Sequence, residues 1–231
     1  MHSQPNLIPI ERLTLWDRAY NSLRSALMAG SLQPGQRIVL REMADQLGIS
    51  LTPVRDAVNR LVAEGALERG SVGVGGGATV PLLNADQFAQ LMLVRGSLEP
   101  VATAAAIGNT TPERLDAIEA DLAEMKAALS DGRIGGYFEA HYRFHFGIYK
   151  LCRMPILLEI IETAWLRCAP TLTLPQYTPG LKRYPLHVAA LQALRNGDGD
   201  AAAEAIRADI QSATAEICPL LDQANPVGKP G

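Results

Sequence analysis

The chain lacks the features of a membrane protein or a secreted protein. None of its apolar runs reaches the ~20 residues needed to span a bilayer. Residues 1–6 (MHSQPN) have neither the basic start nor the apolar core of a signal peptide. Only three cysteines occur, Cys152, Cys168 and Cys218, and their odd number and wide spacing favour reduced thiols over a disulfide framework. We therefore expect a cytoplasmic protein that has no membrane partner.

An excess of charge of one sign is also missing. The 231 residues include 21 Lys and Arg against 24 Asp and Glu, so the net charge of −3 does not attract nucleic acid. Residues 1–81 contain eight Arg, no Lys and seven acidic residues, a net charge of +1, whereas the remainder carries −4. This asymmetry has the sign expected of a DNA-binding N-terminal part, although it is small. Charged residues make up 19% and hydrophobic residues 48% of the chain, which favours a folded protein.

The most informative segment is an amphipathic helix within residues 47–67. We expect Thr52 to cap this helix, with Pro53 at its first position and Gly65 as the left-handed residue after its end. The apolar residues between them share one face, whereas Arg55, Asn59 and Arg60 lie on the other, with Arg55 and Asn59 four apart. Arg and Asn side chains can bind base edges in the DNA major groove. The pattern therefore predicts the second helix of a helix-turn-helix motif.

The flanking segments extend this motif to a winged helix. Residues 13–29 and 40–47 are predicted helices, and residues 37–39 a short strand. Residues 66–80 contain two extended segments around a glycine-rich tip, typical of a β-hairpin wing. The alternatives are a flexible linker or a phosphate-binding loop, but the Lys-Ser or Lys-Thr pair of such a loop is missing. We expect residues 1–81 to form a winged helix-turn-helix DNA-binding domain.

The rest of the chain is rich in Ala and Leu and contains no further strand signal. Prolines, glycines and capping residues divide it into six predicted helices, over residues 84–107, 111–130, 134–153, 155–170, about 180–196, and 198–221. The short connections predict an antiparallel all-α bundle over residues 82–222, followed by a disordered tail at 223–231. The fold class is therefore mostly α, in two domains.

Several polar residues interrupt the apolar faces of these helices. His141 and His145 are four apart on one face, and His187 and Asp209 lie on the apolar stripes of two further helices. A carboxylate on such a face requires an ionic partner or a metal ion. Three imidazoles and one carboxylate could bind a divalent cation. The alternatives are hydrogen-bonded core histidines and a simple His187–Asp209 ion pair.

Arg95 is a further polar residue on an inward stripe. A buried Arg requires an anionic partner. Glu99, one turn further on, could supply it, or Arg95 could bind the carboxylate of an effector.

Two sets of motifs carry a family resemblance. The N-terminal part resembles the GntR family of bacterial transcription regulators through residues 32–37 (LQPGQR), 47–50 (LGIS), 52–57 (TPVRDA) and 61–65 (LVAEG). The second half is similar to the FCD-type ligand-binding domain of the FadR subfamily through residues 95–100 (RGSLEP), 144–145 (FH), 187–193 (HVAALQA) and 196–198 (NGD).

The resemblance implies a homodimer that binds a short palindromic operator in double-stranded DNA and responds to a small metabolite. The DNA contacts that it implies fall on Arg41, Ser50, Thr52, Arg55 and the wing glycines, among them Gly75 and Gly76. Family members usually have Arg directly after the Ser, where this chain has Leu51. Either the operator differs at that point, or Leu51 makes an apolar contact such as one with a thymine methyl group.

The resemblance also implies a metal site, with a departure from its pattern. Many members use Asp, a His four residues later, and two further His separated by 22 positions. Here those positions hold His141, His145, His187 and Asp209. The count of three histidines and one carboxylate is kept, but the carboxylate has moved to the last position. The metal could be Zn, Ni or Mn.

The sequence thus predicts a transcription regulator, expected to be a repressor, that a small carboxylate controls through the helical bundle. Alternatives are a regulator for which the metal ion is itself the signal, and a metal-dependent enzyme within a helical bundle. The enzyme is disfavoured because Glu139 is the only nearby candidate base and the Glu-x-x-His pairs of two-metal bundles are missing.

Overall fold

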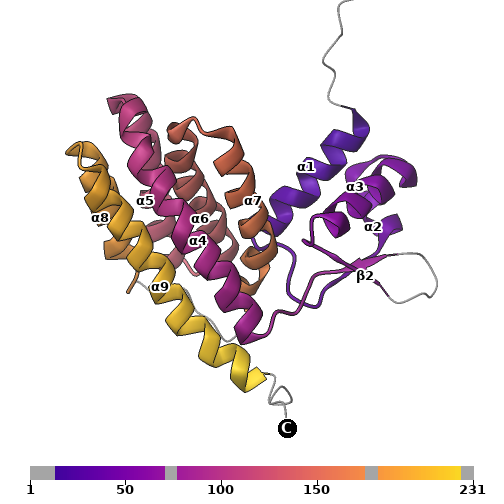
Figure 1. Ribbon diagram of the computed structural model, residues 1–231. Helices are drawn as coiled ribbons and strands as arrows, with labels where there is room; N and C mark the ends of the chain where they lie inside the picture. Colours follow the sequence, from indigo (N-terminus) through magenta and orange to yellow (C-terminus); the bar gives the residue numbers. More distant parts are fainter. Residues whose placement is uncertain (1–13, 71–76, 175–181, 225–231) are drawn as a thin grey trace, which may run out of the picture.

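The computed structural model describes residues 14–70, 77–174 and 182–224, which form a winged helix beside a helical bundle (Figure 1). Gly75, Gly76 and residues 225–231 lie outside the described residues. The predicted tail began at residue 223, but the last helix continues to Ala224. No helix within the described ranges is long and apolar enough to cross a membrane.

The described residues of the N-terminal part form three helices and a small sheet. A capping box between Thr14 and Asp17 starts the first helix. Strand β3 lies between β1 and β2 and is antiparallel to both, so the predicted wing is confirmed. The elements are α1 (Leu15–Met28), β1 (Arg37–Ile38), α2 (Leu40–Leu47), α3 (Leu51–Ala63), β2 (Glu68–Arg69) and β3 (Ala78–Thr79).

Helix α3 begins earlier than the sequence predicts. Ser50 is its N-cap residue, with extended backbone, and Thr52 lies inside the first turn, so the predicted cap at Thr52 is wrong. The reason is the sharp turn at Gly48, where φ is +63°, which needs only two more residues before the next helix starts. Gly65 has φ of +71°, as predicted for a residue that ends a helix.

Within the described residues the bundle has six α-helices, as predicted. Two of them end earlier than expected because their last turns tighten into 3₁₀ helices at Lys150–Cys152 and Ala169–Thr173. The six are α4 (Ala85–Ala106), α5 (Pro112–Ser130), α6 (Ile134–Tyr149), α7 (Pro155–Cys168), α8 (Tyr184–Arg195) and α9 (Gly199–Ala224).

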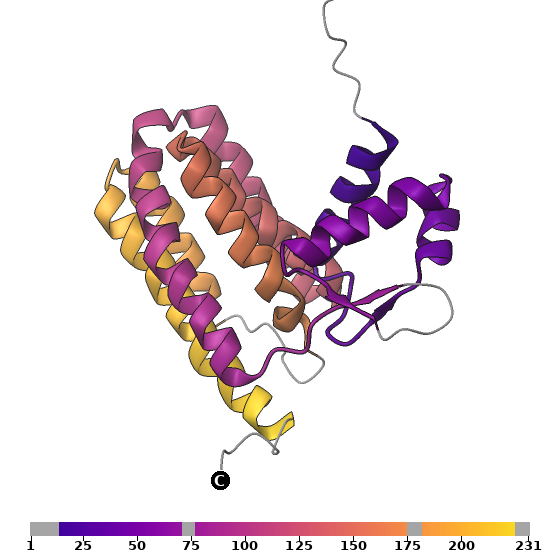
Figure 2. The same ribbon diagram turned by 45° about the vertical axis from the view of Figure 1, so that its right-hand side comes forward.

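Helix α9 runs along α4 and also packs against α8, while α5 packs against α6 (Figure 2). The side chains buried between the helices are largely aromatic around α6 and α7, with Phe144, Phe146, Tyr149 and Trp165 each at most 1% exposed. This apolar interior encloses the polar residues that the sequence singled out.

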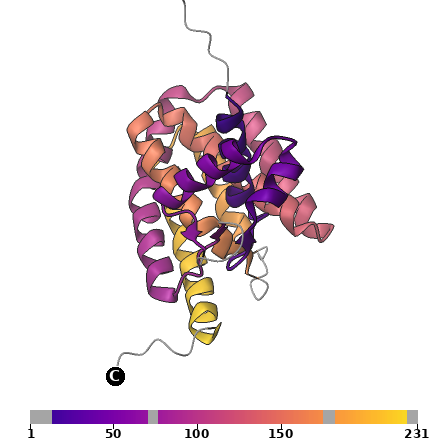
Figure 3. The ribbon, with the colours of Figure 1, turned by 90° about the vertical axis from the view of Figure 1, so that its right-hand side faces the viewer.

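The two parts of the molecule contact each other through α1, which packs against α7 and the 3₁₀ turn that follows it (Figure 3). Arg24 Nη2 on α1 lies 2.7 Å from Glu162 Oε2 on α7. At Gly30, just after α1, an added Cβ would lie 2.1 Å from Cγ2 of Thr173. Close approach of the two parts therefore requires glycine at this position.

Candidate metal centre and DNA-binding face

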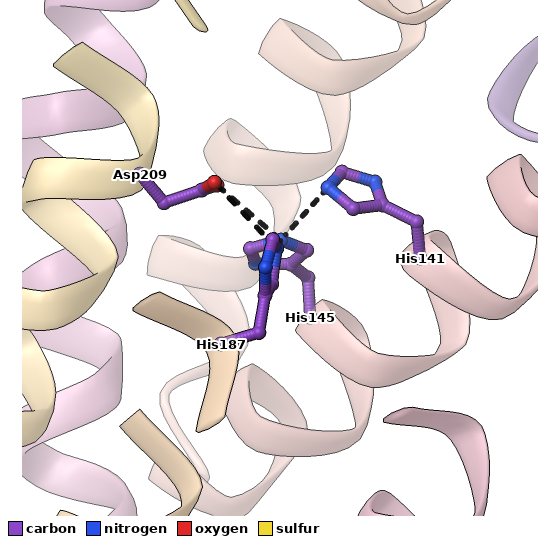
Figure 4. Close-up of side chains that lie close together, drawn as sticks. All are labelled: His141, His145, His187 and Asp209. Carbon is purple, nitrogen blue, oxygen red and sulfur yellow. Dashed lines mark hydrogen bonds and ion pairs between the residues drawn. The ribbon is translucent and has the colours of Figure 1, made fainter. Parts of the chain in front are cut away.

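Three helices bring the four predicted metal ligands together. His141 and His145 lie one turn apart on α6, His187 lies on α8, and Asp209 lies on α9 (Figure 4). Each is at most 3% exposed. His145 Nε2 is 3.1 Å from His141 Nε2 and 3.2 Å from His187 Nε2. Nitrogen ligands of one metal ion, at bond lengths of about 2.1 Å, lie about 3.0–3.4 Å apart. The nitrogen spacing therefore fits a single ion.

The carboxylate of Asp209 completes the cluster. Its Oδ2 lies 3.7 Å from His145 Nε2, and its Oδ1 lies 3.6 Å from His187 Nε2. One ligand atom from each of the four residues lies within 4.8 Å of the others. Three imidazole nitrogens and one carboxylate oxygen form a ligand set that Zn, Ni and Mn accept.

Hydrogen bonds decide which ring nitrogens point into the cluster as acceptors. His187 Nδ1 is 3.0 Å from the carbonyl oxygen of Arg183, which can only accept, so this nitrogen carries the hydrogen. His187 Nε2 therefore presents a lone pair toward His145. If the three imidazole rings were joined by hydrogen bonds alone, each nitrogen lone pair that faces another ring would need an N–H group on that ring.

The buried histidines are neutral in the absence of other ligands. Burial lowers the pKa of His141 and His145 well below the ordinary value, and the positive charge of nearby groups lowers it further. Burial also lowers the pKa of His187, although the carboxylate of Asp209 opposes this shift. Neutral imidazole is the form that coordinates metals.

Arg183 is a neighbour of this cluster that the sequence did not reveal. Its Nη1 lies 3.0 Å from Asp209 Oδ1, and its Nε lies 3.8 Å from Glu216. The shortest ionic contact of Asp209 is thus with Arg183, not the alternative His187–Asp209 pair. Arg183 precedes α8 by one residue and lies four residues before His187, which is the one sequence signal that could have placed it here.

Arg95 occupies the buried interior but is already paired. Its Nε lies 2.6 Å from Glu99 Oε1, and its guanidinium lies over the Trp165 ring at 4.1 Å from the ring centre. Glu99 also accepts hydrogen bonds from Trp165 Nε1 at 2.7 Å and from the Tyr149 hydroxyl at 2.5 Å. Of the two alternatives for Arg95, the structure shows the pair with Glu99.

Tyr149 connects this ion pair to the histidines, because its hydroxyl oxygen lies 2.8 Å from His145 Nδ1. Burial, with the charge of Glu99 as a second cause, raises the pKa of Tyr149 well above the ordinary value. The hydroxyl group therefore keeps its hydrogen.

The predicted DNA-binding residues form an exposed face of the winged helix. Their side chains are exposed on α2, at the N-cap of α3 and along α3, namely Arg41, Ser50, Leu51, Thr52, Arg55 and Asn59. The opposite side of α3 is buried through Val54, Ala57, Val58 and Leu61.

Arg60 differs from the pattern that the sequence suggested. The helical spacing placed it with Arg55 on the outer face, but its guanidinium lies over the Tyr20 ring, 4.0 Å from the ring centre. Its Nε is also 2.7 Å from Glu64 Oε1. Arg60 therefore joins α3 to α1 within the domain.

A winged helix with an exposed polar face, joined to an all-α bundle, is the architecture of a DNA-binding transcription regulator. Comparison with known proteins agrees with this class. Residues 15–79 match the bacterial regulatory proteins of the gntR family, and residues 90–212 match the FCD domain. The chain belongs to the GntR family, with an FCD domain as its second half, and relatives of this kind are regulators and not enzymes.

Individual relatives support the assignment. The HTH-type transcriptional regulator McbR of Escherichia coli is 34% identical over 168 residues, which are 73% of this chain and 75% of McbR. The Nta operon transcriptional regulator of Aminobacter aminovorans is 29% identical over 131 residues, 57% of this chain and 60% of that protein.

Solved structures agree in fold. The structure of E. coli McbR/YncC matches with a TM-score of 0.81 at 30% identity, over 92% of this chain and 99% of that one. A GntR regulator from Rhodococcus sp. RHA1 shares the fold, with a TM-score of 0.70 at 19% identity, over 88% of this chain and 97% of that one.

Proposed function

We propose that the chain is a homodimeric repressor that binds a short palindromic operator and is controlled by a small carboxylate bound in the FCD domain. The observation that carries this proposal is the combination of an exposed Arg/Asn face on α3 with a buried His₃Asp cluster in the attached bundle. The first feature suits DNA, and the second suits a metal ion to which a carboxylate can bind.

The proposed DNA contacts divide into two groups. Arg55 and Asn59 lie on the outer face of α3, where they enter the major groove and bind base edges. Arg41, Ser50 and Thr52 surround the start of that helix and bind phosphates, together with the wing, including Gly75 and Gly76. Leu51 is 38% exposed at the start of α3. Family members usually have Arg at this position, and Leu51 makes an apolar contact with the DNA where that Arg would make an ionic one.

The proposed dimer uses the outer surface of α4 and α7. Val94 and Ile160 line one groove between these helices, and Val101 and Ile156 are also exposed, at 50% and 76%. A second copy of the chain is the proposed occupant because a palindrome requires two DNA-binding domains related by a twofold axis. Sedimentation of Ile160→Glu beside Leu15→Glu, an exposed control on α1, tests this surface. A dimer that persists in Ile160→Glu argues against it.

The proposed metal ligands are His141, His145, His187 and Asp209. The His187 lone pair that faces His145 supports this proposal, because the unprotonated nitrogen of a neutral imidazole is the atom that coordinates a metal. When bound, the metal supplies a Lewis-acidic position for an effector carboxylate.

The effector was predicted to bind Arg95, but a carboxylate at that position would have to displace Glu99 from a buried ion pair. We therefore assign the effector carboxylate to the metal and to the surroundings of the cluster. A signal can reach the DNA-binding part through α7, where the Trp165 ring lies 5.4 Å from the ring of His145 and Glu162 contacts Arg24 of α1. A shift of α7 would move α1, and with it the spacing of the two recognition helices.

The full burial of the cluster favours a second candidate, in which the ion itself is the signal. Titration of DNA affinity with Zn, Ni or Mn, in the presence and absence of small carboxylates, separates the two. If a carboxylate releases the protein from DNA at constant metal concentration, the carboxylate is the signal. If the metal alone changes the DNA affinity, the ion is the signal.

The DNA-binding part of the proposal is tested by selection from random double-stranded DNA. The expected result is a short palindrome whose half-sites lie about one helical turn apart, ~34–36 Å. Recovery of no preferred sequence would contradict the proposed function.

A further inference from the structure

A buried chain of hydrogen bonds leads away from the proposed metal centre. It runs from His145 Nδ1 to the Tyr149 hydroxyl at 2.8 Å, and from that hydroxyl to Glu99 Oε2 at 2.5 Å. All three residues are 0% exposed. The chain joins α6 to α4, two helices that contact each other in the bundle.

The direction of the hydrogen bonds is fixed at the Glu99 end. Arg95 Nε donates to Glu99 at 2.6 Å, and Trp165 Nε1 donates at 2.7 Å. A carboxylate paired with a guanidinium is an acceptor only. Tyr149 has a single hydrogen and must therefore donate it to Glu99, so its oxygen accepts from His145 Nδ1–H.

The consequence falls on the opposite ring nitrogen. If Nδ1 of His145 carries the hydrogen, its Nε2 carries the lone pair, and that atom lies 3.1 and 3.2 Å from the Nε2 atoms of His141 and His187. Histidine ligands of metals commonly donate their second N–H to a carboxylate or carbonyl group, which fixes the tautomer. In this chain a tyrosine stands between the histidine and the carboxylate.

We propose that Tyr149, held by Glu99, is a positioning residue that keeps His145 in the tautomer able to coordinate the metal. Arg95 and Trp165 act through Glu99, which gives the buried Arg95 a role other than effector binding. This inference rests on the proposed metal site.

The first test compares two Tyr→Phe substitutions on α6. Tyr149→Phe removes the acceptor of His145 but keeps the ring, whereas Tyr142→Phe removes a hydroxyl on the same helix that interacts with Arg24 of α1. Zn²⁺ affinity is measured by competition with a chromophoric chelator. We expect Tyr149→Phe to bind Zn²⁺ about 10- to 100-fold more weakly than the wild-type chain, and Tyr142→Phe to bind it equally well. Equal affinity in all three chains would overturn the role of Tyr149.

The second test needs no variant and no metal. Long-range ¹H–¹⁵N correlation spectra of the metal-free wild-type chain distinguish the two tautomers, and His145 is expected with its hydrogen on Nδ1. A hydrogen on Nε2 would overturn the proposal, even if Tyr149→Phe does not fold. A wild-type chain that binds none of Zn²⁺, Ni²⁺ and Mn²⁺ would refute the proposed metal site. The tautomer of His145 would then still decide whether Tyr149 and Glu99 hold its hydrogen on Nδ1.

Discussion

The contact between the two parts of the molecule can be tested at Gly30. This residue has φ of +67°, and an added Cβ would lie 2.1 Å from Thr173 Cγ2 in the bundle. Ordinary carbon contacts are about 3.5–4.0 Å, so Gly30→Ala forces either residue to move. Gly48 offers a matched control within the same domain, because its φ is +63° and no atom lies within 4 Å of its added Cβ.

The two substitutions share the cost of a left-handed backbone, about 1–2 kcal/mol. Gly30→Ala adds the overpacking against Thr173, about 1–3 kcal/mol more. Thr173→Ser removes the clashing methyl group but keeps the hydroxyl that donates to the Pro170 carbonyl oxygen at 2.7 Å. The double variant Gly30→Ala/Thr173→Ser should therefore lose only as much stability as Gly48→Ala.

Thermal unfolding is the assay, since each kcal/mol changes the Tm of a chain of this size by roughly 2–4 °C. We expect Gly30→Ala to have the lowest Tm and Thr173→Ser to restore most of the difference. If Gly30→Ala and Gly48→Ala unfold at the same temperature, the two parts do not dock as described, and the route from α7 to α1 loses its basis.

The remaining predictions concern the winged helix. Arg55→Ala should weaken operator binding by about 1–3 kcal/mol in a gel-shift titration and leave the Tm unchanged. Arg60→Ala should lower the Tm instead, by an amount that reflects about 0.5–1 kcal/mol of cation–π contact, because Arg60 packs on Tyr20. Leu51→Arg should make operator binding fall more steeply with salt, by about one unit of the log–log slope; an unchanged slope would argue that residue 51 does not face a phosphate. Burial, followed by the hydrogen bond to Glu64, raises the pKa of Tyr20 from 10.0 to about 12. The corresponding stability is present below pH 10 and is lost between pH 10 and 12, so the Tm difference between the wild-type chain and Tyr20→Phe should shrink over that range.

Local sequence signals were sufficient for the helices and the wing. Apolar periodicity located the α-helices of the winged helix, and prolines, glycines and capping residues divided the bundle into its α-helices, because these features depend on residues within one or two turns. We expected Thr52 to cap α3, but Ser50, two residues earlier, is also a good capping residue and is the N-cap in the structure. Only the turn at Gly48 decides between them, and its geometry is not visible in the sequence.

The candidate site depended more on tertiary structure. The spacing of His141 and His145 places both on one face of a helix, but their meeting with His187 and Asp209 depends on how three helices pack. The contact of Arg183 with Asp209 was not predicted for the same reason. Arg60 shows the opposite case, in which a residue with the pattern of a DNA-binding side chain packs within its own domain.

The most direct test of the account is metal binding by the intact chain. Equilibrium dialysis against Zn²⁺, Ni²⁺ and Mn²⁺, followed by elemental analysis, should find one ion per chain for at least one of these metals. Asp209→Asn should weaken that binding because it removes the only carboxylate of the cluster. A wild-type chain that retains none of the three ions, or an Asp209→Asn chain that retains them equally well, would contradict the proposed centre.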